Sequence, residues 1–142
     1  MTVESSASAT WEGDLVHGKG TVSPASGSFP EQALTWNNRA NSRAGGTSPE
    51  ELIAAAHSGC FSMALANGLA GAGHAPDRID TTAKVTFAVP GGITGVHLVV
   101  KGKVPGIDAA VFTAAVEDAK ANCPVSKALA AVPITAEATL EL

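Results

Sequence analysis

The chain has 142 residues and a formal net charge of −4, and 45% of its residues are hydrophobic. This length is typical of one globular domain with a single core, so we expect one domain over residues 1–142. Nucleic acids and anionic membrane surfaces bind chiefly through clustered Lys and Arg, which makes both poor partners for an acidic chain. The first ten residues lack the basic start and apolar core of a secretory signal, so we expect a cytoplasmic protein.

The N-terminal third predicts short strands separated by turns and loops. Alternation and turn residues place three strands, at residues 7–12, around 21–22 and near 32–36. The first of them alternates between apolar and polar side chains, as a half-buried strand does. Residues 37–47 carry Arg39 and Arg43 without an apolar period. We expect a surface loop or active-site flap there.

A long helix is predicted to begin at Ser48. Ser48 suits the cap, Pro49 the first helical position, and Glu51 follows the cap by three residues. Apolar residues cover most of the circumference, and small ones permit close approach, so we expect a helix that is buried on nearly all sides and ends near Gly71 or Gly73. Its apolar stretch contains four polar residues, His57, Ser58, Ser62 and Asn67. These favour a core helix over a membrane span.

The C-terminal half predicts a hairpin, two helices and a final strand. The ranges are strands 82–89 and 96–103, helices 108–122 and 124–130, and a strand over 134–142. Because the strands are grouped around helices and do not alternate with them, the fold class is α+β.

The two cysteines decide between a structural and a redox interpretation. In a reducing cytoplasm they are either inert buried thiols or redox-active ones. Cys60 lies within the long helix, where a free Cys is commonly a small core hydrophobe. Cys123 precedes a helix, where free backbone N–H groups lower a thiol pKa below its usual value of about 8.5. Two thiols far apart in sequence that meet in space satisfy the needs of a reversible disulfide cycle.

The histidines are weaker candidates than the cysteines for a catalytic or metal-binding role. His57 is three residues before Cys60, which allows a Cys–His nucleophile pair of the hydrolase or acyltransferase kind. No third group to orient such a base is visible, so a hydrogen-bonded core histidine is the favoured interpretation. Neither Cys-x-x-Cys nor His-x-x-x-His spacing occurs, and we expect no metal and no cofactor.

Two segments, each with one cysteine, carry a resemblance to a known family. TSPEELIAAAHSGCFSMAL at 47–65 resembles the hallmark helix of the OsmC/Ohr family, the osmotically induced and organic hydroperoxide resistance proteins. NCPVS at 122–126 is similar to that family's second cysteine motif. Shorter segments resemble the OsmC branch and extend the likeness over nearly the whole chain: WEG at 11–13, GKGTV at 18–22, DTTA at 80–83 and VPGID at 104–108.

The resemblance implies a fold and an activity. The implied fold has antiparallel sheets packed around a long buried central helix in an intertwined homodimer. The implied activity is reduction of organic hydroperoxides and hydrogen peroxide in oxidative and osmotic stress defence. Cys60 would attack the peroxide and form a sulfenic acid, and Cys123 would resolve it as a Cys60–Cys123 disulfide. The implied reductant is a dithiol, with a lipoyl-bearing protein as the candidate.

The family's loop arginine and helix-start glutamate match Arg39 and Glu50, with Arg43 as a competitor for the arginine role. A guanidinium beside a sulfur stabilises the thiolate, and a carboxylate can hold that guanidinium in a fixed fork. Glu50 and Cys60 are about 15 Å apart along one straight helix, so one arginine head cannot touch both. We therefore expect sites that combine residues from both chains of a homodimer. The alternative function is an apolar-ligand-binding or structural domain with inert cysteines.

Overall fold

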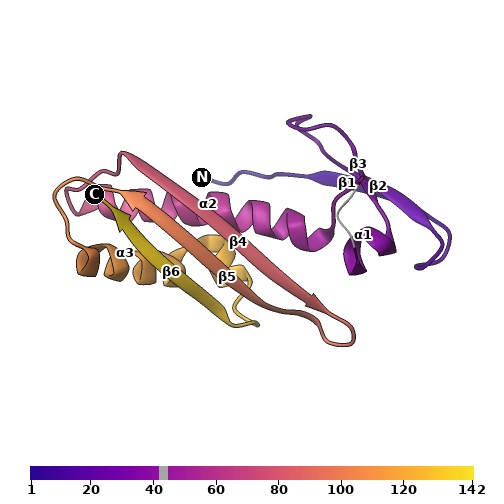
Figure 1. The fold of residues 1–142 in the computed structure, drawn as a ribbon. Helices are drawn as coiled ribbons and strands as arrows, with labels where there is room; N and C mark the ends of the chain where they lie inside the picture. Colours follow the sequence, from indigo (N-terminus) through magenta and orange to yellow (C-terminus); the bar gives the residue numbers. More distant parts are fainter. Residues whose placement is uncertain (42–44) are drawn as a thin grey trace. The chain divides into compact units, whose positions relative to one another are not determined.

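The computed structural model describes residues 1–41 and 45–142, and these form two compact units, Met1–Leu52 and Ile53–Leu142 (Figure 1). The first unit contains an antiparallel sheet in the order β1-β2-β3. Its strands are β1 (Ala7–Glu12), β2 (Lys19–Pro24) and β3 (Gln32–Leu34). All three predicted strands are confirmed, but β1 is exposed along its whole length in the single chain and is not half-buried.

The segment after β3 differs from the prediction of a loop. Residues Trp36–Ala40 form a short helix, α1, because Thr35 caps it: the Thr35 hydroxyl oxygen accepts the Asn38 backbone N–H at 3.0 Å. A cap of this kind satisfies one of the free N–H groups at a helix start. The helix is too brief to show an apolar period. Arg39 therefore lies on a helical turn, whereas Arg43 lies outside the described residues.

The long helix α2 spans Pro49–Gly71, and its predicted start and end are confirmed. The Glu51 N–H donates to the Ser48 hydroxyl oxygen at 3.1 Å, and the Thr47 hydroxyl donates to the Glu51 carboxylate at 2.6 Å. These bonds occupy a donor that a helix start leaves free and fix the acidic first turn.

The second unit contains a mixed sheet in the order β4-β5-β6. β4 (Arg78–Ala88) and β5 (Gly92–Lys103) form the predicted hairpin, and its turn uses the positive φ of Gly91 and Gly92. β6 (Ile134–Glu141) pairs with β5 in parallel. The expected antiparallel pairing holds for β1–β2, β2–β3 and β4–β5, and the β5–β6 pair departs from it. A parallel partner needs a crossover connection, which α3 (Ala109–Asn122) and α4 (Pro124–Ala128) provide.

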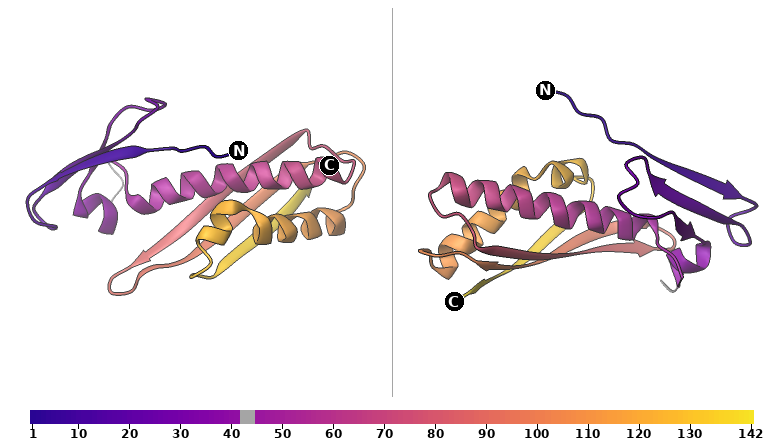
Figure 2. Two further views of the ribbon diagram at one scale, coloured as in Figure 1. Left: turned by 180° about the vertical axis from the view of Figure 1, so that it is seen from behind. Right: turned by 90° about the horizontal axis from the view of Figure 1, so that it is seen from above.

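Helices α2 and α3 cover the same face of this sheet (Figure 2). The core lies between these helices and the sheet. Its side chains come from α2, α3, β5 and the residues that directly follow β5 and α3: Phe61, Leu65, Leu69, Val96, Leu98, Val100, Val104, Phe112, Val116, Ala119 and Cys123. Asp108 caps α3 as predicted, since its carboxylate accepts the Val111 N–H at 2.9 Å.

Helix α2 is buried on one face only in the single chain, so the prediction of burial on nearly all sides is wrong for the isolated chain. Beyond its first turn, its buried residues recur every four positions, at His57, Phe61, Leu65 and Leu69, which is the spacing of one helix face. Met63, on another face, is 75% exposed. By length and composition alone α2 could cross a membrane, but core helices share those properties.

Candidate active site

In the first unit, Arg39 on α1 forms a two-pronged ion pair with Glu50 in the first turn of α2. The Arg39 Nε donates to Glu50 Oε1 and Nη2 donates to Oε2, both at 3.0 Å. Glu50 is buried, with 2% of its side chain exposed, whereas Arg39 is 32% exposed. A buried carboxylate requires such a partner, and the two parallel bonds fix the guanidinium plane. Arg39 is thereby held with part of its surface open to a ligand.

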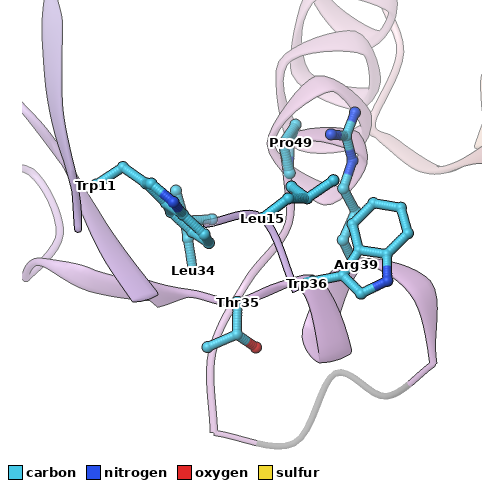
Figure 3. A pocket seen from close by; sticks show the side chains of 7 residues that line it. All are labelled: Trp11, Leu15, Leu34, Thr35, Trp36, Arg39 and Pro49. Atoms are coloured by element: carbon cyan, nitrogen blue, oxygen red, sulfur yellow. The ribbon is translucent and has the colours of Figure 1, made fainter. Parts of the chain in front are cut away.

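Arg39 also lines a cavity of about 320 Å³ within the first unit (Figure 3). The lining is mostly apolar and comes from the sheet, the turn after β1, the α1 helix with its cap, and the start of α2: Trp11, Leu15, Leu34, Thr35, Trp36, Arg39 and Pro49. Ligand pockets typically combine an apolar wall with a few fixed polar groups. This cavity suits a small ligand that has an apolar body and a polar end near the guanidinium.

In the second unit, the two cysteines meet at the start of α4. Cys60 is half-buried on α2, and Cys123, fully buried, occupies the break between α3 and α4. Both are free thiols, and they are hydrogen-bonded to each other. Both also receive backbone N–H groups from the first turn of α4. Two thiols in contact are placed for thiol–disulfide chemistry.

The surroundings shift the pKa values of the two thiols in opposite directions. Burial raises the pKa of Cys60 above its usual value, and the neighbouring Cys123 raises it further, against the Val125 N–H. Burial alone would also raise the pKa of Cys123. Hydrogen bonds from the Ser126 N–H, the Cys60 thiol and the Ser126 hydroxyl outweigh that effect and lower the pKa of Cys123. The lowered pKa predicted for Cys123 is thus confirmed, and in the single chain the negative charge is better accommodated on Cys123.

His57 is a hydrogen-bonded core residue, the interpretation that its sequence context favoured. Its Nε2 lies 2.7 Å from the Ser126 hydroxyl oxygen, and both residues are buried. Burial lowers the pKa of His57, so its neutral form predominates near neutral pH. The described hydrogen bond of the ring goes to Ser126, which gives the Cys60–His57 hydrolase alternative no support from its geometry.

This chain is similar in sequence to a known protein family. Residues 41–137 match the family described as OsmC-like protein. Peroxiredoxin OsmC of Escherichia coli K12 is 48% identical over 134 residues, which cover 92% of this chain and 93% of that protein. The chain belongs to the OsmC family.

Solved structures of OsmC-family and related proteins have the same fold. The organic hydroperoxide resistance protein OhrB of Bacillus subtilis superposes with a TM-score of 0.67 at 26% identity, covering 96% of this chain and 98% of that one. An OsmC-like protein from Mycoplasma pneumoniae superposes with a TM-score of 0.73 and full coverage of both chains. At 14% identity the latter likeness concerns the fold alone.

The four residues that the OsmC/Ohr resemblance singled out fall into two pairs. Arg39 with Glu50 belongs to the first unit, and Cys60 with Cys123 to the second. Ser126 was missed as a functional candidate. Its place three residues after Cys123, at the start of a predicted helix, was the available signal, since i and i+3 positions are neighbours on a helix. Among residues 1–41 and 45–142, no cluster of metal-ligating side chains occurs.

Proposed function

We propose that this chain, a peroxidase of the OsmC family, reduces organic hydroperoxides and hydrogen peroxide through its two thiols. The observation that carries the proposal is the contact between Cys60 and Cys123 in the core of the second unit. Cys60 attacks because it is half-buried and a peroxide can reach it, whereas Cys123 is fully buried.

The chemistry proceeds in two steps with balanced atoms. The Cys60 thiolate attacks one peroxide oxygen, the O–O bond breaks, and the other oxygen leaves with a proton as an alcohol or water. Cys60 then carries a sulfenic acid. Cys123 attacks the Cys60 sulfur, the S–S bond forms, and hydroxide leaves and is protonated to water. A dithiol reductant, for which a lipoyl-bearing protein is the candidate, returns the disulfide to two thiols.

The first step requires a cation near Cys60, because burial raises the pKa of that thiol in the single chain. Arg39 is the candidate for this cation. Glu50 holds its guanidinium in a fixed orientation, and about a third of the side chain stays exposed. A guanidinium both lowers a thiol pKa and stabilises charge that develops on a peroxide oxygen. The apolar cavity beside Arg39 favours peroxides with an apolar tail.

Adding one equivalent of cumene hydroperoxide to the reduced protein should remove both free thiols. The reason is that a sulfenic acid on Cys60 has Cys123 as its immediate partner. Thiol titration and peptide mass spectrometry should find an intramolecular Cys60–Cys123 disulfide. The alternative function, apolar-ligand binding with inert cysteines, is favoured by the cavity in the first unit. Thiols that survive the peroxide would support that alternative and overturn the peroxidase.

We further propose that the working unit is a homodimer whose sites combine residues of both chains. Glu50 and Cys60 are ten residues apart on the continuous helix α2, about 15 Å along its axis. An arginine paired with Glu50 is better placed to serve the sulfur of a partner's antiparallel helix. The exposed face of α2, which includes Ala55, Gly59 and Met63, gives such a partner a surface of small and apolar residues.

Mixing two inactive variants should then restore activity. Cys60→Ser chains and Arg39→Ala chains, unfolded and refolded together, form heterodimers in which one site holds an intact Cys60 and an intact Arg39. We expect up to about half of the wild-type activity per heterodimer, because the second site carries both substitutions. Each variant refolded alone is the control. No recovery, with heterodimers detected by native mass spectrometry, would mean that each site is built within one chain.

A further inference from the structure

A buried hydrogen-bond chain leads from His57 to the resolving thiol. His57 on α2 and Ser126 on α4 are 69 residues apart in sequence, yet His57 Nε2 lies 2.7 Å from the Ser126 Oγ. The His57 side chain is fully buried, and Ser126 is 4% exposed. The Ser126 hydroxyl also hydrogen-bonds to Cys123, whose thiol contacts Cys60. The chain His57, Ser126, Cys123 therefore ends at the cysteine pair.

The donors and acceptors along this chain have a consistent arrangement. A serine hydroxyl has one hydrogen. If Ser126 donates that hydrogen to the Cys123 sulfur, its oxygen accepts a hydrogen from His57 Nε2. A neutral imidazole carries one N–H only, so Nδ1 becomes a bare acceptor. Among the residues that the structure describes, Nδ1 is buried without a hydrogen-bond partner. A buried acceptor without a partner is tolerated better than a buried N–H without one.

We propose that His57 and Ser126 are positioning residues for the resolving step, in which His57 orients the Ser126 hydroxyl and Ser126 directs its O–H at the Cys123 sulfur. This inference rests on the proposed peroxidase function. Neither residue touches the peroxide in this scheme. Both act through Cys123.

In the resolving step, one proton leaves the Cys123 thiol and one proton is taken up by the departing hydroxide. Cys123 gives up its thiol proton and attacks the sulfur of the Cys60 sulfenic acid. The S–S bond forms, the S–O bond breaks, and the leaving hydroxide takes up one proton to become water. No further oxidant is needed, because the peroxide has already oxidised Cys60. The Ser126 O–H stabilises the Cys123 thiolate, and the attacking species is the thiolate and not the thiol.

Among the described residues, the groups that act on the pKa of Cys123 are Ser126, Cys60 and Val125. From α2, Cys60 acts on Cys123 directly and His57 acts through Ser126, while α4 contributes the Ser126 hydroxyl and backbone N–H groups. Cys123 belongs to the same hydrophobic core cluster as Leu98 and Val100 of β5 and Val116 of α3. The ionisation of Cys123 should therefore depend strongly on the hydroxyl of Ser126.

The test follows disulfide formation after one equivalent of cumene hydroperoxide, by stopped flow, as a function of pH. Ser126→Ala removes the donor, and His57→Leu removes the group that orients it. In both variants we expect disulfide formation to slow about tenfold or more at pH 7, the scale expected for a lost hydrogen bond to a charged group. Because the thiolate loses a stabilising donor, its pKa rises and the pH–rate profile should shift upward by about one unit. Dimedone should trap more Cys60 sulfenic acid in both variants than in the wild type.

Two further variants separate positioning from simple packing. His57→Gln keeps an amide N–H near the Nε2 position and should recover most of the rate. Ser62→Ala is the matched control, because Ser62 is a part-buried serine on α2 whose described hydrogen bonds go to the Ser58 carbonyl and the Thr81 hydroxyl, both at 2.8 Å. The Ser62→Ala variant should form the Cys60–Cys123 disulfide at the wild-type rate. If His57→Leu fails to fold, Ser126→Ala decides the question.

A wild-type rate and unshifted pH profile in Ser126→Ala would overturn the inference, as would an equal loss in Ser62→Ala. A wild-type protein that forms neither sulfenic acid nor disulfide would overturn the proposed peroxidase function.

Discussion

Replacing Cys60 by serine should abolish peroxide turnover, whereas Cys123→Ser should consume about one equivalent of peroxide and then stop. A serine at position 60 cannot form a sulfenic acid. A serine at position 123 lets the sulfenic acid form and leaves it without a thiol partner. Cumene hydroperoxide consumption is measured for Cys60→Ser with excess dihydrolipoamide and for Cys123→Ser without added thiol, and intact-protein mass spectrometry should find one added oxygen on Cys123→Ser.

This experiment discriminates sharply because the thiol environments in the single chain favour the opposite assignment. The pKa of Cys123 is lowered by hydrogen bonds despite its burial, and the pKa of Cys60 is raised by burial. If ionisation in the single chain decided reactivity, Cys123 would be oxidised first. Multiple turnovers by Cys60→Ser, or a single oxidation at Cys123 in that variant, would show that accessibility is not the deciding factor. Thermal unfolding of each variant is the folding control.

Arg39→Ala should slow peroxide attack by about 10²- to 10³-fold, the scale of losing one preorganised donor at a developing charge. The loss has two sources, a higher pKa of Cys60 and a peroxide oxygen without its donor. Stopped-flow sulfenic acid formation across pH measures both. The substitution also leaves buried Glu50 without its partner, which should lower the free energy of unfolding by about 3 kcal/mol. Rates must therefore be compared well below the melting temperature.

Arg39→Lys is the matched control, because it keeps the charge and loses the two-pronged geometry. Its rate should fall between those of the wild type and Arg39→Ala. Arg43→Ala should have a mild effect, since the resemblance assigns the arginine role to Arg39 and Arg39 pairs with Glu50. A larger loss at Arg43 than at Arg39 would reverse the choice of arginine.

Features encoded by neighbouring residues were predictable from the sequence. The start of α2 is an example, because the cap at Ser48 and the acidic first turn lie within four residues. The lowered pKa of Cys123 is another, since the N–H groups that cause it follow directly in the chain. Helix α1 was missed because five residues are too few for a period, so Thr35 was its only available signal.

Features that depend on distant contacts were not predictable from local pattern. The direction of β6 is set by its pairing with β5, and alternation is the same in a parallel and an antiparallel strand. The exposure of one face of α2 in the single chain was also not predictable, because an apolar helix surface does not indicate which element covers it. The hydrogen bond between His57 and Ser126 joins residues 69 positions apart. The pairing of Arg39 with Glu50 came from the resemblance, because a separation of eleven residues follows no helical or strand period.

The contact between the two thiols affects how well the enzyme resists inactivation by excess peroxide. A cysteine sulfenic acid can react with a second peroxide and pass to the sulfinic acid, which is irreversible except where a dedicated enzyme repairs it. In this fold that second peroxide must compete with Cys123, which is already beside Cys60. Well-oriented groups within one molecule can behave as if present at about 10⁵ M or more, far above any peroxide concentration in a cell. Burial of Cys123 adds to the protection, because the thiol kept in reserve is itself shielded from oxidants. On the proposed mechanism, the fold that supplies the second thiol thereby limits irreversible over-oxidation of the first.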